Sequence, residues 1–339
     1  MDATTHVSYY PNFDWLRLML ATEVVAIHSN AAPSVFINPV PGFLAISGFV
    51  VLGSIERRTP GAFFLSRALR ILPLLFASFL AVGILYSPAE MLYNIRFWIW
   101  PKGAPPPNPV VWTLLYEEVF YALLVILFVS GLYKKKILPV LLCSIVITLT
   151  LSRNFFLLQK TWYTLGSAFF TGNVIYLFRG LISKYINSIL ATALFVLAVA
   201  AVYSNPYTDI TPNSEAYVDL LSYAAMLIFA ISGPQLPKVH LDISYSIYLI
   251  HCLVLAQLVY FIKPGTRLFV FTLLSTISIS FASWYLIERP MIGLKTKILQ
   301  IRTAPSKKRR AMPTGMPKAE PPQALRLLLY NSWLSRKKK

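Results

Sequence analysis

The sequence predicts an all-α fold, a polytopic membrane bundle of about ten transmembrane helices with a basic cytoplasmic C-terminal tail. Of its 339 residues, 56% are hydrophobic and only 13% are charged, whereas a soluble protein carries about 25% charged residues. Ten apolar segments approach or reach the length of about 20 residues that crosses a hydrocarbon core. Helices are expected there because lipid offers backbone amides no partner outside the segment. The segments are 15–31, 38–55, 68–86, 110–133, 137–151, 162–178, 186–203, 217–232, 243–262 and 268–287.

The net charge of +18 is concentrated near the C-terminus. Residues 289–339 hold 14 basic residues and one acidic residue, against 17 and 12 in residues 1–288. By the positive-inside rule we expect both termini in the cytoplasm. We also expect the chain to be a multi-pass protein of the plasma (inner) membrane. We expect a membrane domain over 1–291 and a basic tail over 292–339, which either lies on anionic lipid or is solvated. Because residues 1–291 are so apolar, we do not expect a nucleic-acid partner.

Neither a metal site nor a bound cofactor is expected from the cysteines. Cys143 and Cys252 lie inside separate apolar segments, and the sequence holds no C-x-x-C pair. The N-terminus lacks the basic region and cleavage site of a signal peptide. The first apolar segment is therefore expected to be retained.

Ionisable residues on the first segment form one polar stripe. At about 100° per residue, Arg17 and His28 fall near Asp14, while Glu23 falls on the opposite face. Such side chains cost at least ~2.5–3.5 kcal/mol at the bilayer centre and usually mark function. Asp14 and Arg17 can pair at i,i+3, but His28, roughly 16 Å further along, needs a partner from another segment. His28 is a candidate general base; the alternative is a histidine that only hydrogen-bonds a neighbouring helix.

Two adjacent glutamates enter the fourth segment just after Trp112. Glu117 and Glu118 point about 100° apart, so they cannot share one partner. One is expected to face an arginine such as Arg17, and the other to orient a histidine. The alternative is a pair that extends to the aqueous interface.

Arg67 and Arg70 lie one helical turn apart where the third segment begins. Guanidinium groups bind phosphate bidentately, so this pair predicts a site for a phosphorylated cytosolic ligand. The alternative is ordinary positive-inside anchoring.

A second histidine lies in the ninth segment. Ser244, Tyr248 and His251 share one helical face, with the tyrosine one turn before the histidine. Core packing with a hydrogen bond is the alternative to a role in the site.

Taken in order over residues 9–291, these segments resemble the acyltransferase-3 family, integral-membrane enzymes that use acyl-CoA to modify surface glycans. The resemblance rests on six features, with Leu18-Met19 as a slight departure where the family often has a small residue after the arginine. They are Arg17-x10-His28 preceded by Asp14, GFLAISGFVV, FFLSRALRILP, WTLLYEEVFY, SYSIYLIH and YLIERP.

The resemblance implies roles for these residues. His28 would be the catalytic base with Arg17 as an essential partner, and Arg67 and Arg70 would bind the acyl-CoA donor. Glu117 matches a family glutamate, while Trp112, Asp14, Glu118, Tyr248 and His251 would line the site.

The implied activity is O-acyl transfer, with acetyl the expected group, from acyl-CoA to a hydroxyl of a carbohydrate. Exopolysaccharide, lipopolysaccharide, a lipid-linked oligosaccharide and a lipochitooligosaccharide are compatible acceptors. His28, held in one tautomer by a carboxylate such as Glu117, would activate the acceptor; the alternative is a relay through an acylated carrier. A proton-coupled transporter or flippase would use the same buried ionisable residues, and a structural scaffold would need none of them.

Overall fold

The computed structural model describes residues 9–31, 36–134, 136–151, 159–204, 214–294 and 298. Across this part of the chain the secondary structure is helical, with no β-strand. A π-helical turn, Trp284–Glu288, continues the last helix. The helices are α1 (Asn12–His28), α2 (Pro39–Ile55), α3 (Pro60–Leu85), α4 (Pro88–Ile99), α5 (Trp112–Val129), α6 (Ile137–Leu151), α7 (Lys160–Tyr185), α8 (Ser188–Ser204), α9 (Ser214–Ser232), α10 (Ser244–Leu258) and α11 (Thr266–Ser283).

Every one of the ten predicted apolar segments overlaps a helix, so the all-α fold is confirmed. Within the described residues, four stretches are long and apolar enough to cross a membrane, and the number of about ten spans therefore stays a prediction. The tail expected over 292–339 lies outside the described residues, apart from 292–294 and 298. The four stretches are Pro60–Leu85, Pro109–Val129, Lys160–Tyr185 and Thr266–Leu294.

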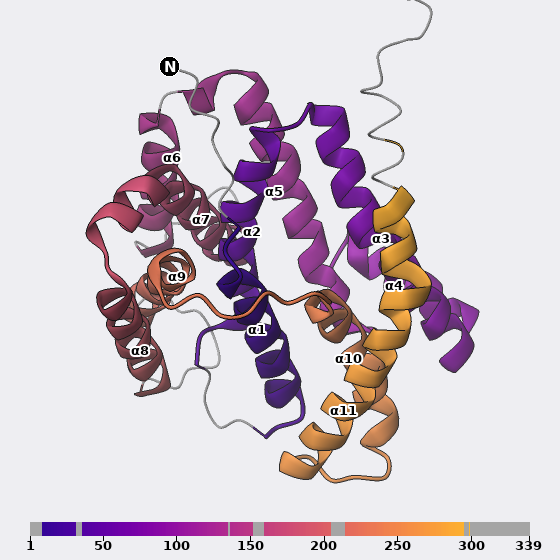
Figure 1. Ribbon diagram of the computed structural model, residues 1–339. Helices are drawn as coiled ribbons and strands as arrows, with labels where there is room; N and C mark the ends of the chain where they lie inside the picture. Colours follow the sequence, from indigo (N-terminus) through magenta and orange to yellow (C-terminus); the bar gives the residue numbers. More distant parts are fainter. Residues whose placement is uncertain are drawn as a thin grey trace, which may run out of the picture. The chain divides into compact units, whose positions relative to one another are not determined.

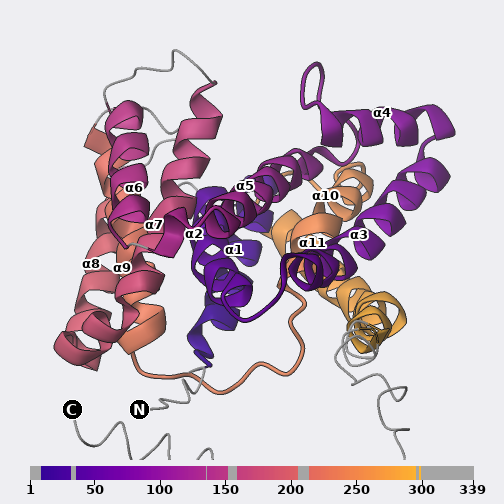
Figure 2. The same ribbon diagram turned by 90° about the horizontal axis from the view of Figure 1, so that it is seen from above.

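The helices of the membrane domain fall into two groups with three helices between them (Figures 1 and 2). Helices α6 to α9 lie together on one side, and α3, α4, α10 and α11 lie on the other. Between the two groups are α1, α2 and α5. Helix α3 contacts α2, and α10 contacts α1 and the turn before α5. Polar residues of the three middle helices are therefore placed to meet those of α3 and α10.

Helix α4 lies in the connection between the third and fourth predicted apolar segments. Ser87 caps its N-terminus by accepting a hydrogen bond from the backbone N–H of Glu90 at 3.2 Å. The helix packs on α3, where Trp98 meets the ring of Phe79 at a centroid distance of 6.0 Å. Residues Pro88–Ile99 are therefore a helix packed on α3.

The connection from α4 to α5 is fixed by two buried asparagines. Asn94 and Asn108 exchange two hydrogen bonds of 3.0 Å between side chain and backbone. The amide of Asn108 also donates to the carbonyl of Leu249 in α10, at 3.1 Å. These bonds hold the start of α5 against α10, which matters for the site below.

Glycines bring α2 and α7 into close contact. A Cβ on Gly48 would collide with the carbonyl oxygen of Phe169, and a Cβ on Gly172 with that of Ala45. Small residues at such positions let two helix backbones approach, as in membrane helix pairs. Because Gly48 faces α7, the preceding Ser47 is turned toward α5.

Replacing Gly48 by alanine is expected to destabilise the bundle. The added methyl group meets the Phe169 carbonyl, so the helices must separate, at a cost of about 1–3 kcal/mol. The thermal transition of the detergent-purified variant measures this loss. Gly180→Ala is the matched control, since a Cβ there meets nothing within 4 Å; equal losses in both variants would contradict the close-contact explanation.

Candidate active site

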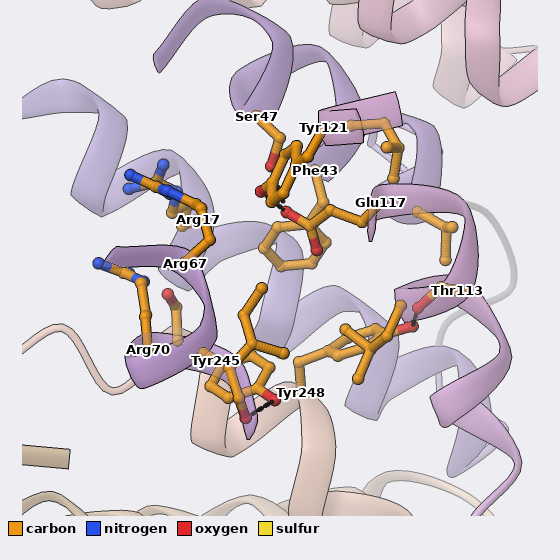
Figure 3. A pocket seen from close by; sticks show the side chains of 15 residues that line it. Arg17, Phe43, Ser47, Arg67, Arg70, Thr113, Glu117, Tyr121, Tyr245 and Tyr248 are labelled. Atoms are coloured by element: carbon orange, nitrogen blue, oxygen red, sulfur yellow. Dashed lines mark hydrogen bonds between the residues drawn. The ribbon is translucent and has the colours of Figure 1, made fainter. Parts of the chain in front are cut away.

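A polar cavity of about 80 Å³ lies where α1, α2, α3, α5 and α10 meet (Figure 3). Its lining combines three arginines, one glutamate and several hydroxyl groups in a largely apolar bundle. The lining residues are Arg17, Val40, Phe43, Leu44, Ser47, Arg67, Arg70, Ile71, Thr113, Leu114, Glu117, Tyr121, Ser244, Tyr245 and Tyr248. The cavity therefore joins Arg17, Arg67, Arg70, Glu117 and Tyr248, which the sequence proposed separately.

The three arginines lie on one side of the cavity, but they differ in their partners (Figure 3). Arg70 forms an ion pair with Asp242, which also accepts a hydrogen bond from Ser244 at 2.6 Å. Arg17 lies 3.7 Å from Asp14, so the predicted i,i+3 pair is confirmed. Arg67 has no ion pair within the described residues, and its buried Nε has no hydrogen-bond partner there.

Arg67 is instead held over an aromatic ring. Its guanidinium carbon lies 5.9 Å from the centroid of Tyr121, a distance typical of a cation–π contact. Unlike Arg17 and Arg70, it has no carboxylate partner within the described residues. Of the predicted phosphate-binding pair, Arg67 is therefore free to take an anion, whereas Arg70 is engaged by Asp242.

Glu117 and Glu118 point into different cavities, as their 100° separation predicted. Glu117 accepts hydrogen bonds from Ser47 Oγ at 2.8 Å and from the hydroxyl of Tyr121. Glu118 lines a second cavity, which Arg67 and Tyr121 also line. The expectation that Glu117 orients His28 is wrong, since its carboxylate is bound by the hydroxyl groups of α2 and α5.

His28 finds its partner in α10. Its Nδ1 lies 2.7 Å from Nε2 of His251, and the two rings are stacked with centroids 5.0 Å apart. His28 is exposed, whereas His251 is fully buried. The prediction that another segment supplies the partner of His28 is confirmed, and that partner is the second predicted histidine.

The hydrogen bonds of His251 assign the tautomers of both rings. Nδ1 of His251 lies 2.7 Å from the carbonyl of Tyr248 and 3.2 Å from that of Ile247. Because carbonyl oxygens only accept, Nδ1 carries the proton, and Nε2 of the neutral ring is an acceptor. His28 then donates from Nδ1, which leaves its Nε2 with a free lone pair.

Cys252 completes a group of three possible metal ligands with the two histidines. Their donor atoms lie within 4.8 Å of one another, and Sγ is 3.5 Å from Nδ1 of His28. Two nitrogens on one tetrahedral zinc ion would lie roughly 3.3 Å apart, given Zn–N bonds of about 2.0–2.1 Å. The 2.7 Å separation fits a shared proton better than a shared ion, and the absence of a metal stays a prediction.

Tyr248 connects the cavity to the histidine pair. Its ring lines the cavity, its hydroxyl lies 2.8 Å from Thr113 Oγ1, and its ring centroid lies 6.2 Å from that of His251. Arg17 and His28 sit on the face that α1 turns to α10. The cavity and the histidine pair therefore lie at two positions along the contact between α1 and α10.

Sequence reasoning missed several residues of this site. Ser47 and Tyr121 hold Glu117, Thr113 holds Tyr248, and Asp242 holds Arg70. Ser47 and Asp242 could have been predicted, because each is a polar residue inside or beside an apolar segment of the sequence.

Trp112 does not line the cavity. Its ring packs on that of Tyr116 at a centroid distance of 5.5 Å. Asp14 also stays outside the cavity, although its pair with Arg17 places the guanidinium there.

Comparison with known proteins agrees with these features. The acyltransferase-3 family model, described as an acyltransferase domain, matches residues 10–287. Nodulation protein 10 of Rhizobium leguminosarum bv. viciae is 27% identical over 361 aligned residues, which cover 86% of this chain and 95% of that protein. No solved structure matches the chain.

The Arg70–Asp242 pair predicts an acid-sensitive contribution to stability. Burial opposes ionisation of Asp242, but the charges of Arg70 and Arg17 hold its pKa below the ordinary value. A lowered pKa stabilises the fold above the unfolded value of about 3.9 and loses that effect as the pH falls.

Asp242→Asn should therefore lower stability by about 1–3 kcal/mol at neutral pH. The difference between the melting temperatures of the two proteins, measured from pH 7 to pH 3, should begin to narrow below about pH 4, and it should close only as the pH falls through the lowered pKa of Asp242. A difference that stays constant down to pH 3 would show that the carboxylate charge is not the cause.

Proposed function

Because this chain belongs to the acyltransferase-3 family, we propose that it is a membrane O-acyltransferase. It moves an acyl group, acetyl in the expected case, from acyl-CoA to a hydroxyl of a carbohydrate. The acceptor class is a surface glycan or glycolipid, such as exopolysaccharide, lipopolysaccharide or a lipid-linked oligosaccharide. Residues 1–291 form the catalytic membrane domain in this proposal, and the basic tail over 292–339 lies on the cytoplasmic side of the plasma membrane.

The arginine-lined cavity receives the donor. Coenzyme A carries its phosphates as anions, and arginine is the side chain best suited to bind them. Arg67 supports this role because its buried Nε has no partner within the described residues. Arg70 keeps its charge beside Arg67 through Asp242, and Arg17 adds a third positive charge to the same lining.

His28 acts as the general base. The tautomer set by His251 leaves a lone pair on Nε2 of His28, and this side chain is exposed where an acceptor can approach. His28 removes the proton from the acceptor hydroxyl as its oxygen attacks the thioester carbonyl carbon. The carbon–sulfur bond then breaks, and the proton passes from His28 to the departing sulfur, which leaves as the free thiol of coenzyme A.

His251 positions and supports this base. Its Nε2 accepts from His28 Nδ1, so it favours the cation that His28 becomes during the reaction. Two carbonyls of α10 fix the ring of His251 in turn. The pair resembles a base with an orienting group, the arrangement that general acid–base catalysis requires.

The donor reaches His28 along the face shared by α1 and α10. Arg17 and His28 are separated by eleven residues, roughly 16 Å of helix, and Tyr248 lies between the arginines and the histidine pair. The extended pantetheine arm of coenzyme A suits such a span. One observation carries the proposal: helix α1 borders an arginine-lined cavity near one end and carries an exposed histidine, paired with His251, at the other.

Replacing His28 by alanine tests the base directly. Acyl transfer from labelled acyl-CoA, measured in membranes that hold equal amounts of protein, should fall by about 10²–10⁴-fold. His240→Ala is the matched control, since His240 is exposed in the chain connecting α9 to α10 and does not line the cavity. Full transfer by His28→Ala would contradict the assignment, and an absence of thioester cleavage by the wild type would favour a transporter.

His251 should affect turnover rather than donor binding. In His251→Phe the Nδ1 proton of His28 loses its acceptor, so kcat is expected to fall by about 10–100-fold while KM for acyl-CoA stays constant. His251→Gln can restore an acceptor and should retain more activity. Steady-state kinetics with both variants decide the point; an unchanged kcat in His251→Phe would show that the pair is only structural.

A further inference from the structure

The histidine pair has a third donor atom beside it, the thiol of Cys252. Sequence spacing did not predict this group, because its members come from two helices, α1 and α10. The proposed reaction uses the two histidines, whereas Cys252 takes no part in it. Sγ of Cys252 lies 3.3 Å from Nε2 of His251 and 3.5 Å from Nδ1 of His28. A sulfur atom therefore faces the contact between the two imidazole rings.

Two of the three distances within this group match a tetrahedral zinc site. A nitrogen and a sulfur on one zinc ion lie about 3.6 Å apart, given Zn–N bonds of about 2.0–2.1 Å and Zn–S bonds of about 2.3 Å. Both nitrogen–sulfur distances are close to this value. The two nitrogens, 2.7 Å apart, share a proton as they stand. A zinc ion can replace that proton once the rings separate by roughly 0.6 Å, to the spacing that its bonds require.

His251 already has the orientation of a metal ligand. Its Nδ1–H donates to the carbonyl of Tyr248 at 2.7 Å, so Nε2 presents a lone pair. Metal-binding histidines usually hold their second nitrogen in this way, which fixes the tautomer and the direction of the ring. Because Sγ of Cys252 lies beside that lone pair, the two ligands from α10 face the same point.

His28 provides both the movement and the route of entry. It is the last residue of α1 and is exposed, whereas His251 and Cys252 are buried. An exposed side chain changes its rotamer readily, so His28 can open the pair while the two ligands on α10 stay in place. An ion reaches the group from the exposed side of His28. The same side leaves the fourth position of the tetrahedron to water.

We propose that His28, His251 and Cys252 bind a zinc ion, and that this ion inhibits acyl transfer. Two imidazoles and a thiolate suit zinc, whereas Mg²⁺ and Ca²⁺ prefer oxygen ligands. The thiol of Cys252 gives up its proton on binding. Nδ1 of His28 then holds the metal, so the proton of this neutral ring lies on Nε2, the atom that must accept the proton of the acceptor hydroxyl. The inhibition rests on the proposed function, but the binding of the ion does not.

Cys252→Ser tests the binding, because serine keeps the size of the side chain and removes the sulfur ligand. The matched control is Cys143→Ser, since Cys143 is also a buried free cysteine but lies in α6 beside Thr171. The detergent-purified full chain and Cys143→Ser should retain zinc after excess ion is removed, as measured by elemental analysis. Cys252→Ser should bind zinc at least about tenfold more weakly. With Co²⁺ as the probe, the wild type should show a thiolate-to-metal absorption band that Cys252→Ser lacks.

The same variants test the inhibition. Zinc should lower kcat of the wild type and of Cys143→Ser by about tenfold or more, and a chelator should restore it. KM for acyl-CoA should stay constant, because the arginine of α1 that lines the donor cavity is roughly 16 Å from His28 along the helix. Without added metal, Cys252→Ser should be as active as the wild type, and it should resist zinc. Mg²⁺ should inhibit none of the three proteins.

Wild-type zinc affinity in Cys252→Ser, or an equal loss of zinc in Cys143→Ser, would overturn the site. So would full acyl transfer by a wild type whose cobalt band shows that the thiolate holds the metal. Melting temperatures separate a lost ligand from a lost fold, and Cys252→Ala repeats the comparison if the serine variant is unstable. A wild type that consumes no acyl-CoA would contradict the proposed function, while the binding measurements would still decide the zinc site. The two failures are therefore distinguishable.

Discussion

The structure depends on one constraint: an ionisable side chain inside an apolar bundle needs a polar partner, and another segment of the chain supplies one for His28, Glu117 and Arg70. Hydrogen-bond donors and charges without partners are costly in such a setting. His28 is bound by His251, Glu117 by Ser47 and Tyr121, and Arg70 by Asp242. These contacts join α1, α2, α3, α5 and α10, and the polar cavity lies at the place where they meet.

The same constraint identifies which groups are available for a ligand. Most polar side chains around the cavity already have partners, whereas Arg67 has no ion pair, and its buried Nε has no hydrogen-bond partner, within the described residues. Arg67 borders both cavities and is held over Tyr121 by its guanidinium face. A side chain fixed in this way binds an anion at little further entropic cost, which makes Arg67 central to the proposed donor site.

Much of the fold and part of the site could be predicted from the sequence. Apolar length alone located ten of the helices, and the angular positions of Arg17 and His28 correctly predicted one shared face on α1, which is the face turned to α10. Local rules also contained the signal for α4, since Ser87, Pro88 and Glu90 form a helix start of the capping-box type. Helix α4 was nevertheless not among the predicted segments, because its 12 residues are short of the length of about 20 that crosses a hydrocarbon core.

Partners between helices could not be predicted in the same way. Asp242 and Glu117 are both carboxylates near apolar segments, and only the packing of α10 against α3 determines that Asp242 binds Arg70. Likewise, the choice of His251 over a glutamate as the partner of His28 depends on the contact of α1 with α10. Helical periodicity gives the direction of a side chain, but the identity of its neighbour depends on how the helices pack.

The central claim is that one donor molecule extends from Arg67 to His28 along the contact between α1 and α10. A cryo-EM structure of the protein with a non-hydrolysable acyl-CoA analogue tests it most directly. We expect density for the phosphates beside Arg67 and for the acyl carbonyl beside Nε2 of His28, with the arm passing Tyr248. An analogue bound with its carbonyl far from His28, or with its phosphates away from Arg67, would contradict this account.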